Sequence, residues 1–198
     1  MNIGTPYGLA LASGIDAYIP LLSYAVCVRF FHLFKVNPSL TFITQDWFMI
    51  ILVILALADL FADKIPVVDH VWDAIHTVLR PVTGALVAAA ASNQTSGAAL
   101  LLPIIFGGTL AGMAHTTKAA TRLTSTATTA GIANVGISIA EDIAVVIATL
   151  LSLFAPVIMV IVVVLFVIIF LAVVPRLLRM LGRGLRKLGM WRSRSGAA

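Results

Sequence analysis

The sequence predicts an all-α protein, a polytopic bundle of about five to six membrane-spanning helical segments. Its composition and its long apolar runs carry this prediction. Of the 198 residues, 61% are hydrophobic and only 11% are charged, and the mean hydropathy is +1.08. Soluble domains contain roughly 45–50% apolar and about 25% charged residues, and a fold of this size could not bury so much apolar surface. The composition therefore excludes disordered chains, secreted disulfide scaffolds and nucleic-acid-binding domains.

Apolar runs long enough to cross a bilayer, which takes about 20 residues, recur along the chain. The clearest, residues 157–174, has no charge, and the others are residues 9–31, 47–61, 98–114 and 137–154. Residues 82–91 are too short to cross alone. They can cross if they continue the more polar helix 71–80, with Pro81 as a kink or a break.

Residues 9–31 are expected to form a retained first span, because the chain before them has no basic residue and Asp16 interrupts them. A cleavable signal peptide has the opposite pattern. Asp16, close to Pro20, is either an ion or proton site or a helix cap.

Basic residues gather at the C-terminal end. Residues 176–198 hold seven of the 13 lysines and arginines, interleaved with leucines at helical spacing. Because positively charged flanks stay in the cytoplasm, we expect a transmembrane domain 1–175 and a cytoplasmic amphipathic tail 176–198. The expected partners are the lipid bilayer and, for the tail, anionic lipid headgroups. Nucleic acid is not an expected partner, because the basic tail has no folded domain of its own.

Charged residues also occur within the predicted spans, where each costs roughly 2.5–3.5 kcal/mol on insertion scales. In the first half, Asp59 and Asp63 lie four residues apart and share a helix face, and Lys64 follows them. Asp73, His76 and Arg80 then recur at intervals of three and four, which places them on one polar face of the next helix.

A second polar stripe has the same spacing. His115, Lys118 and Arg122 follow a glycine-rich apolar helix, and residues 121–129 are mostly threonine, serine and alanine. We expect residues 121–129 to be a broken or re-entrant segment, which is tolerated at membrane depth where protein or water surrounds it. In the next run, Asn134, Ser138 and Glu141 share a face, with Asp142 beside them.

These charges can satisfy one another if acids face the basic stripe His115–Lys118–Arg122 in the bundle interior. The best acidic candidates are Asp63, Asp73, Glu141 and Asp142. The alternative is a purely structural ion-pair network, but buried pairs are weak stabilisers, so their number favours a water-lined pathway. The candidate substrate- or ion-binding residues are Asp63, Lys64, Asp73, His76, Arg80, His115, Lys118, Arg122, Asn134, Glu141 and Asp142.

Several of these positions fall in motifs that resemble a known family. The motifs are Gly14-Ile15-Asp16-Ala17-Tyr18, Ala62-Asp63-Lys64-Ile65-Pro66, Asp69, Trp72-Asp73, His76-Thr77, Arg80-Pro81 and Gly84-Ala85, followed by His115, Lys118, Arg122, Asn134, Ser138 and Glu141-Asp142. Together they resemble the bacterial membrane proteins catalogued as domain of unknown function 4126. The resemblance covers nearly the whole chain except the basic tail. It implies an inner-membrane protein and implies no activity.

Two functions remain open at this stage. One is a small transporter or channel for an anionic or proton-coupled small substrate, and the other is a non-catalytic scaffold whose buried charges are structural. An enzyme is not expected, and neither is a cofactor. A metal site would need further ligands beside Asp73 and His76, such as His70, His115 or Glu141. At 21.0 kDa the chain is small for a complete transporter, which favours a homo-oligomer.

Overall fold

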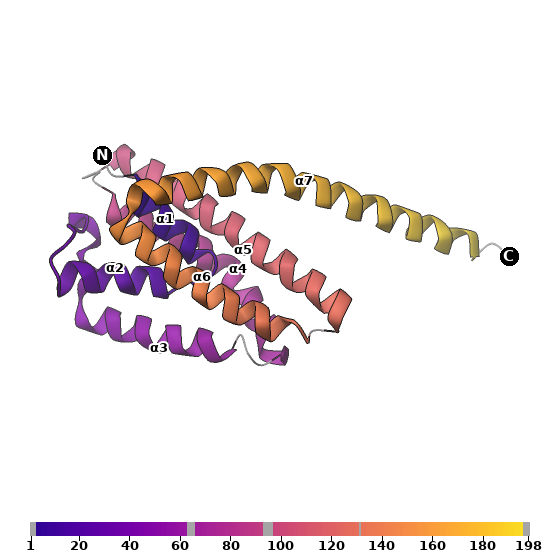
Figure 1. Ribbon diagram of the computed structural model, residues 1–198, viewed down its shortest axis with the longest axis horizontal. Helices are drawn as coiled ribbons and strands as arrows, with labels where there is room; N and C mark the ends of the chain where they lie inside the picture. The colour runs from indigo at the N-terminus through magenta and orange to yellow at the C-terminus, as the bar shows by residue number, and fades with distance from the viewer. Residues whose placement is uncertain (1–2, 63–65, 93–96, 131, 196–198) are drawn as a thin grey trace. The chain divides into compact units, whose positions relative to one another are not determined.

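The computed structural model describes residues 3–62, 66–92, 97–130 and 132–195 (Figure 1). The chain divides into two compact units, residues 1–163 and 164–198. The polar residues predicted to form a site belong to the first unit.

Helices make up most of the described chain, which contains no strand, so the predicted all-α fold is confirmed. In chain order they are α1 (Gly4–Ser13), α2 (Ile19–Arg29), the 3-10 helix η1 (Pro38–Thr44), α3 (Asp46–Ala62), α4 (Pro66–Ala91), the 3-10 helix η2 (Gly97–Leu100), α5 (Leu101–Thr129), α6 (Asn134–Phe154) and α7 (Pro156–Ser195).

Four stretches of the described chain are long and apolar enough to cross a membrane: residues 74–91, 97–126, 134–154 and 156–174. The pair η1 and α3, bent by 60°, adds a fifth. The protein is therefore a multi-pass membrane protein by the length and composition of its helices. α7 continues as one helix past residue 175, where we expected the transmembrane domain to end.

The prediction of one continuous span over residues 9–31 is wrong. The chain forms two short helices there, α1 of 10 residues and α2 of 11 residues. Each is about 15–16 Å long, half the thickness of the hydrocarbon layer. The break follows from Asp16, whose Oδ1 accepts the backbone N–H groups of Tyr18 and Ile19, both at 2.8 Å, at the start of α2. Pro20 fits this first turn because it needs no hydrogen-bond acceptor for a backbone N–H.

The prediction of a broken segment over residues 121–129 is also wrong, because α5 remains helical to Thr129. Its threonine hydroxyls donate to the backbone carbonyl one turn earlier, as Thr121 does to Thr117 at 2.9 Å and Thr124 to Ala120 at 2.8 Å. The hydroxyls are thereby satisfied within the helix, so a threonine-rich helix needs no water to hydrate it. Similarly, α4 continues through Pro81 as one helix, so residues 82–91 extend the polar helix before them.

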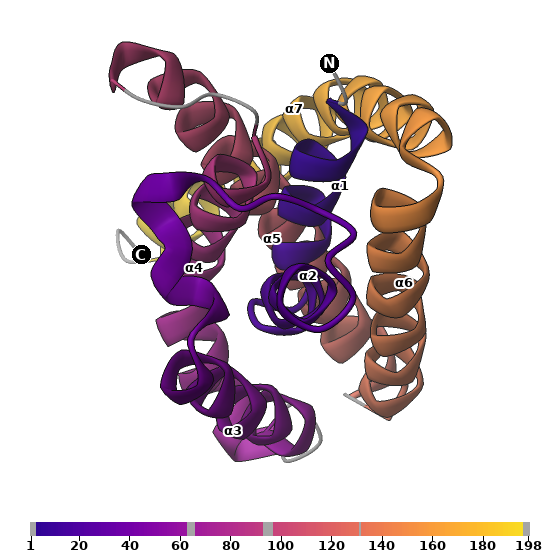
Figure 2. The same ribbon diagram turned by 90° about the vertical axis from the view of Figure 1, so that its left-hand side faces the viewer.

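Helix α1 lies among α4, α5 and α6 (Figure 2). Glycines allow these backbones to approach closely. A Cβ added to Gly14 would lie 2.3 Å from the carbonyl oxygen of Ala111, and one added to Gly84 would lie 2.3 Å from the Cβ of Ala111. The central position of α1 brings the break at Asp16 into the polar interior.

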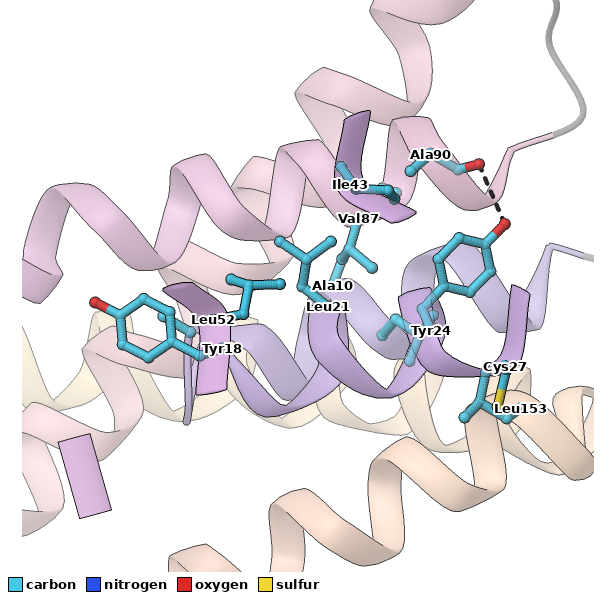
Figure 3. Close-up of a cluster of buried hydrophobic side chains, with 13 residues drawn as sticks. Ala10, Tyr18, Leu21, Tyr24, Cys27, Ile43, Leu52, Val87, Ala90 and Leu153 are labelled. Carbon is cyan, nitrogen blue, oxygen red and sulfur yellow. Dashed lines mark hydrogen bonds between the residues drawn. The ribbon is translucent and has the colours of Figure 1, made fainter. Parts of the chain in front are cut away.

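A hydrophobic cluster lies where α2 meets η1, α3 and α4 (Figure 3). Leu21, Ile43 and Val87 are fully buried in it. The hydroxyl of Tyr24 donates to the backbone oxygens of Lys35 and Ala90, at 3.0 and 3.2 Å, so the polar end of this ring is satisfied.

Candidate functional site

Three buried side chains from α3 and α4 form the first polar cluster. Asp59 of α3 lies 3.6 Å from Nε2 of His76 and 3.9 Å from Nη2 of Arg80, measured to its Oδ1. The same oxygen accepts the indole N–H of Trp72 at 2.7 Å. The side chains of His76 and Arg80 are completely buried and that of Asp59 is 2% exposed, so these charges lie inside the bundle.

Arg80 extends this cluster to His115 on α5. Its Nη1 donates to Nδ1 of His115 at 2.9 Å, and an arginine can only donate, so this imidazole nitrogen carries no proton. The other nitrogen, Nε2, lies 3.2 Å from the hydroxyl of Thr77 and carries the ring proton. His115 is therefore neutral in this arrangement and links α5 to α4.

His76 has the opposite tautomer. Its Nδ1 lies 2.8 Å from the backbone oxygen of Trp72, which can only accept, so this nitrogen donates. The other ring nitrogen, Nε2, faces Asp59 and forms an ion pair with it when Nε2 also carries a proton. The rings of Tyr18 and Trp72 pack against the imidazole, with ring centres 5.6 and 5.3 Å away.

The second cluster joins α5 to α6. Arg122 donates to Oε2 of Glu141 through Nε at 3.2 Å and through Nη2 at 2.8 Å. Nζ of Lys118 lies 3.5 Å from the same oxygen and donates to the backbone oxygen of Ile15 at 3.2 Å. The prediction that an acid faces the basic stripe is thus confirmed for Glu141. Lys118 also ties the stripe to the break between α1 and α2.

A narrow pocket connects the two clusters. It leaves about 0 Å³ for a water-sized molecule, and its lining comes from the α1–α2 break, α3, α5 and α6. The lining residues are Ile15, Asp16, Asp59, Leu60, Lys118, Glu141, Asp142 and Val145. Four carboxyl groups and one ammonium group line the pocket, and Arg80 and Arg122 contact two of these carboxyl groups from outside the lining. A site of this composition suits a proton better than an anion.

Asp16 caps α2, as one of the two sequence interpretations predicted, and it also lines the pocket. It lies in the connection between α1 and α2, outside the candidate spans. The pKa of Asp16 is raised from its ordinary value of 3.8 to about 6, chiefly by burial and also by the nearby carboxylate of Asp59. The backbone N–H groups of Ile19 and Tyr18, together with the more distant Arg80, oppose the rise.

The remaining predicted site residues are less close to the pocket or lie outside the described part of the chain. Asn134 donates to the hydroxyl of Thr126 at 2.9 Å, near the end of α5. Asp63 and Lys64 lie outside the described residues, and so does the side chain of Asp73.

Asp59 and Asp16 line the pocket but are absent from the candidate binding residues selected from the sequence, where Asp16 was interpreted as either an ion or proton site or a helix cap. Both interrupt apolar runs, and an acidic residue in such a run is itself a signal of an interior polar site. Within the described residues, histidine, cysteine, aspartate and glutamate form no group of three or more that could hold a metal ion.

The family model described as Domain of unknown function (DUF4126) matches residues 3–176. None of the curated proteins and none of the solved structures gives a match to this chain. The matched range includes both polar clusters and every residue that lines the pocket. This chain is therefore a member of the DUF4126 family.

Proposed function

We propose that this protein is a small membrane transporter or channel that binds a proton at the pocket between Asp59 and Glu141. The observation that carries the proposal is the acidic lining of that pocket, four carboxyl groups against one lysine, inside a bundle of apolar helices. Ionisable groups are expensive within a membrane and mark ion or proton pathways in many membrane proteins.

An anionic substrate, the alternative expected from the basic stripe, has less support. Arg122 directs two of its donors at Glu141, Lys118 contacts the same carboxylate, and His115 contacts Arg80 and Thr77. An anion at this stripe would have to displace bonds to protein groups that already supply the negative charge.

Glu141 offers a simple coupling step. A proton that binds its carboxylate removes the negative charge that holds Lys118 and Arg122. The contact of α5 with α6 would then lose its main electrostatic attraction, so that α5 and α6 could move apart. Loss of the proton would restore the contact, so proton binding and helix movement are linked at one residue.

The distribution of charge along the chain supports a proposed membrane location and orientation. Residues 176–198 hold seven basic residues, which would keep this end in the cytoplasm and attract it to anionic lipid headgroups of an inner membrane. We also propose a homo-oligomer, since a chain of 21.0 kDa is small for a complete transporter.

A membrane scaffold is the second candidate, and a specific observation favours it. The buried charges contact one another directly, and the pocket between them is narrow. A bundle held by such contacts could serve only to position its apolar surface or its basic tail for a partner.

Proton flux into liposomes decides between the two candidates. The full chain is reconstituted with a pH-sensitive dye inside the vesicles, and flux is started with a potassium diffusion potential of either sign. We expect flux above that of empty vesicles, and we expect Glu141→Gln and Asp59→Asn to reduce it by about tenfold or more, since each removes a proton acceptor but keeps the side-chain shape.

The matched control is Asp46→Asn, which makes the same chemical change at an exposed carboxylate paired with Arg29. Its flux should equal that of the wild type. Absence of wild-type flux under both potentials would refute the proposal and leave the scaffold. Flux that is unchanged in both Glu141→Gln and Asp59→Asn would place the pathway elsewhere.

A further inference from the structure

Helix α6 turns its polar side inward. Its outer side carries apolar residues such as Ile139, Ile143 and Ile147, each about half exposed, whereas the buried and partly buried positions on its inner side are mostly polar, apart from Val145 and Leu153. The inner side consists of Asn134, Ser138, Glu141, Asp142, Val145, Thr149 and Ser152. From residue 134 to residue 152 a helix rises about 27 Å, close to the hydrocarbon thickness of about 30 Å. One face of α6 is therefore polar across nearly the whole membrane.

Several oxygens along this face have no hydrogen-bond partner among the described residues. They are Oδ1 of Asn134, Oγ of Ser138 and Oγ1 of Thr149 on α6, and Oγ of Ser125 on α5. An acceptor is available within the helix, since Ser152 on the same face donates to the backbone oxygen of Ala148 at 2.6 Å. Buried polar atoms almost always have a partner, and in protein interiors a bound water often supplies it.

Neighbouring contacts place these oxygens along the boundary of α6 with α5 and α1. The bonds from Asn134 to Thr126 and from Arg122 to Glu141 bracket Ser125 and Ser138, so these two serines lie at the contact of α5 with α6. Toward the other end of α6, the hydroxyl of Thr5 on α1 donates to the backbone oxygen of Ser152 at 2.8 Å.

We propose that the polar face of α6 binds a file of single water molecules, and that this file carries protons to and from Glu141. The role in proton transfer rests on the proposed function, whereas the bound water does not. Hydroxyl and amide oxygens spaced along a helix can each bond to a water and orient it toward the next, which is what a proton relay between two membrane surfaces requires.

Val145 divides this file. It is completely buried, lines the pocket, and lies one helical turn from Glu141 on one side and from Thr149 on the other. Its side chain offers no hydrogen bond to water, and an apolar constriction of this kind closes a pathway by excluding water. In the conformation described, Val145 therefore separates the part of the file at Glu141 and Ser138 from the part at Thr149.

Isosteric substitutions test for the bound water by the sign of their effect on stability. Thr149→Val and Ser138→Ala remove the two hydroxyls with little change of shape. If these hydroxyls bond to water, both variants melt at a lower temperature than the wild type. If they are dry and unpaired, both melt at a higher temperature, because an unfavourable buried group has been removed. Thr124→Val is the control, since its hydroxyl donates to the backbone of Ala120 on an exposed side of α5.

Proton flux in liposomes tests the use of the file. We expect Thr149→Val and Ser138→Ala to slow flux several-fold, Thr124→Val to leave it unchanged, and Val145→Thr to raise it about tenfold by giving the constriction a hydroxyl. The water file would be overturned if Thr149→Val and Ser138→Ala melt at higher temperatures than the wild type and carry protons at the same rate as the wild type. Glu141→Gln would still reduce flux in that case, and the proposed function would stand. If the wild type carries no protons, the relay fails with the proposed function, and the melting temperatures alone decide whether water is bound.

Discussion

The indole N–H of Trp72 donates to Oδ1 of Asp59 at 2.7 Å, and so fixes the carboxylate that His76 and Arg80 approach at 3.6 and 3.9 Å. The bond joins α3 to α4. A carboxylate held by a neutral donor keeps its charge available for a second partner, because the indole neither titrates nor neutralises it. Trp72 is thus a positioning residue for the first polar cluster.

Loss of this donor should destabilise the protein. In Trp72→Phe the ring is nearly preserved but Asp59 loses its strongest hydrogen bond, so we expect a loss of about 1–3 kcal/mol in the free energy of unfolding. The melting temperature in detergent should fall by several degrees. Trp47→Phe is the control, because the indole N–H of Trp47 bonds to Gln45 in an exposed position. Equal melting temperatures for the two variants would contradict a positioning role.

The second cluster predicts an asymmetry between its members. Glu141 contacts both Lys118 and Arg122, so Glu141→Leu deprives two buried cations of the same carboxylate. Arg122→Leu leaves Glu141 with Lys118. Breaking a buried pair costs about 3–5 kcal/mol, and we expect Glu141→Leu to approach or exceed this range while Arg122→Leu costs clearly less.

Urea or thermal unfolding of the purified variants measures this difference. Arg29→Leu provides the reference for an exposed pair, because Arg29 and Asp46 lie 3.2 Å apart with side chains 49% and 72% exposed. Its effect should be about 0–1 kcal/mol. A larger loss in Arg122→Leu than in Glu141→Leu would mean that the carboxylate is not the centre of this cluster.

Asp16 predicts a pH dependence of stability. Its pKa in the folded protein is about 6, above the ordinary 3.8, so the folded state favours the neutral carboxyl. The contribution of Asp16 to stability is therefore greatest below pH 3.8 and is lost as the pH rises through about 6. Asp16→Asn keeps an oxygen to cap α2 and cannot titrate.

The difference in melting temperature between Asp16→Asn and the wild type should consequently change over this pH range. Asp16→Asn should gain stability relative to the wild type as the pH rises from about 4 to about 7. If the difference in melting temperature between Asp16→Asn and the wild type is the same from about pH 4 to about pH 7, the pKa of Asp16 is not raised in the folded protein.

Helical intervals predicted which polar residues share a face, but they could not predict which acid meets which base. The spacing of His76 and Arg80, and that of Lys118 and Arg122, sets their rotation about one helix axis. Their acidic partners depend on how α3 crosses α4 and how α6 crosses α5, which no local pattern records. Among the described side chains, the first cluster consequently centres on Asp59 rather than on one of the acids favoured by sequence.

Two local predictions failed for a common reason. The threonine-rich end of α5 and the apolar run 9–31 were judged by their average polarity, whereas single hydrogen bonds decide their structure. Threonine hydroxyls that donate to the carbonyl one turn earlier, as Thr124 does, are satisfied without breaking the helix. One carboxylate that accepts two backbone N–H groups, as Asp16 does, starts a new helix within an apolar run.

The close approach of α1 to α5 makes Gly14 intolerant of any side chain. A Cβ there would lie 2.3 Å from the backbone oxygen of Ala111, so Gly14→Ala must push α1 and α5 apart and should cost about 1–3 kcal/mol. The separation would also move Ile15, whose backbone oxygen binds Lys118. Gly136→Ala is the matched control, because no atom lies within 4 Å of its added Cβ, and it should stabilise α6 by about 0.5–1 kcal/mol. If Gly14→Ala matched Gly136→Ala in melting temperature, the tight contact of α1 with α5 would be refuted. Gly107→Ala, a second glycine variant at a tight contact, separates loss of stability from loss of flux. If Gly14→Ala loses both stability and proton flux while Gly107→Ala loses only stability, the displacement of Ile15 explains the lost flux.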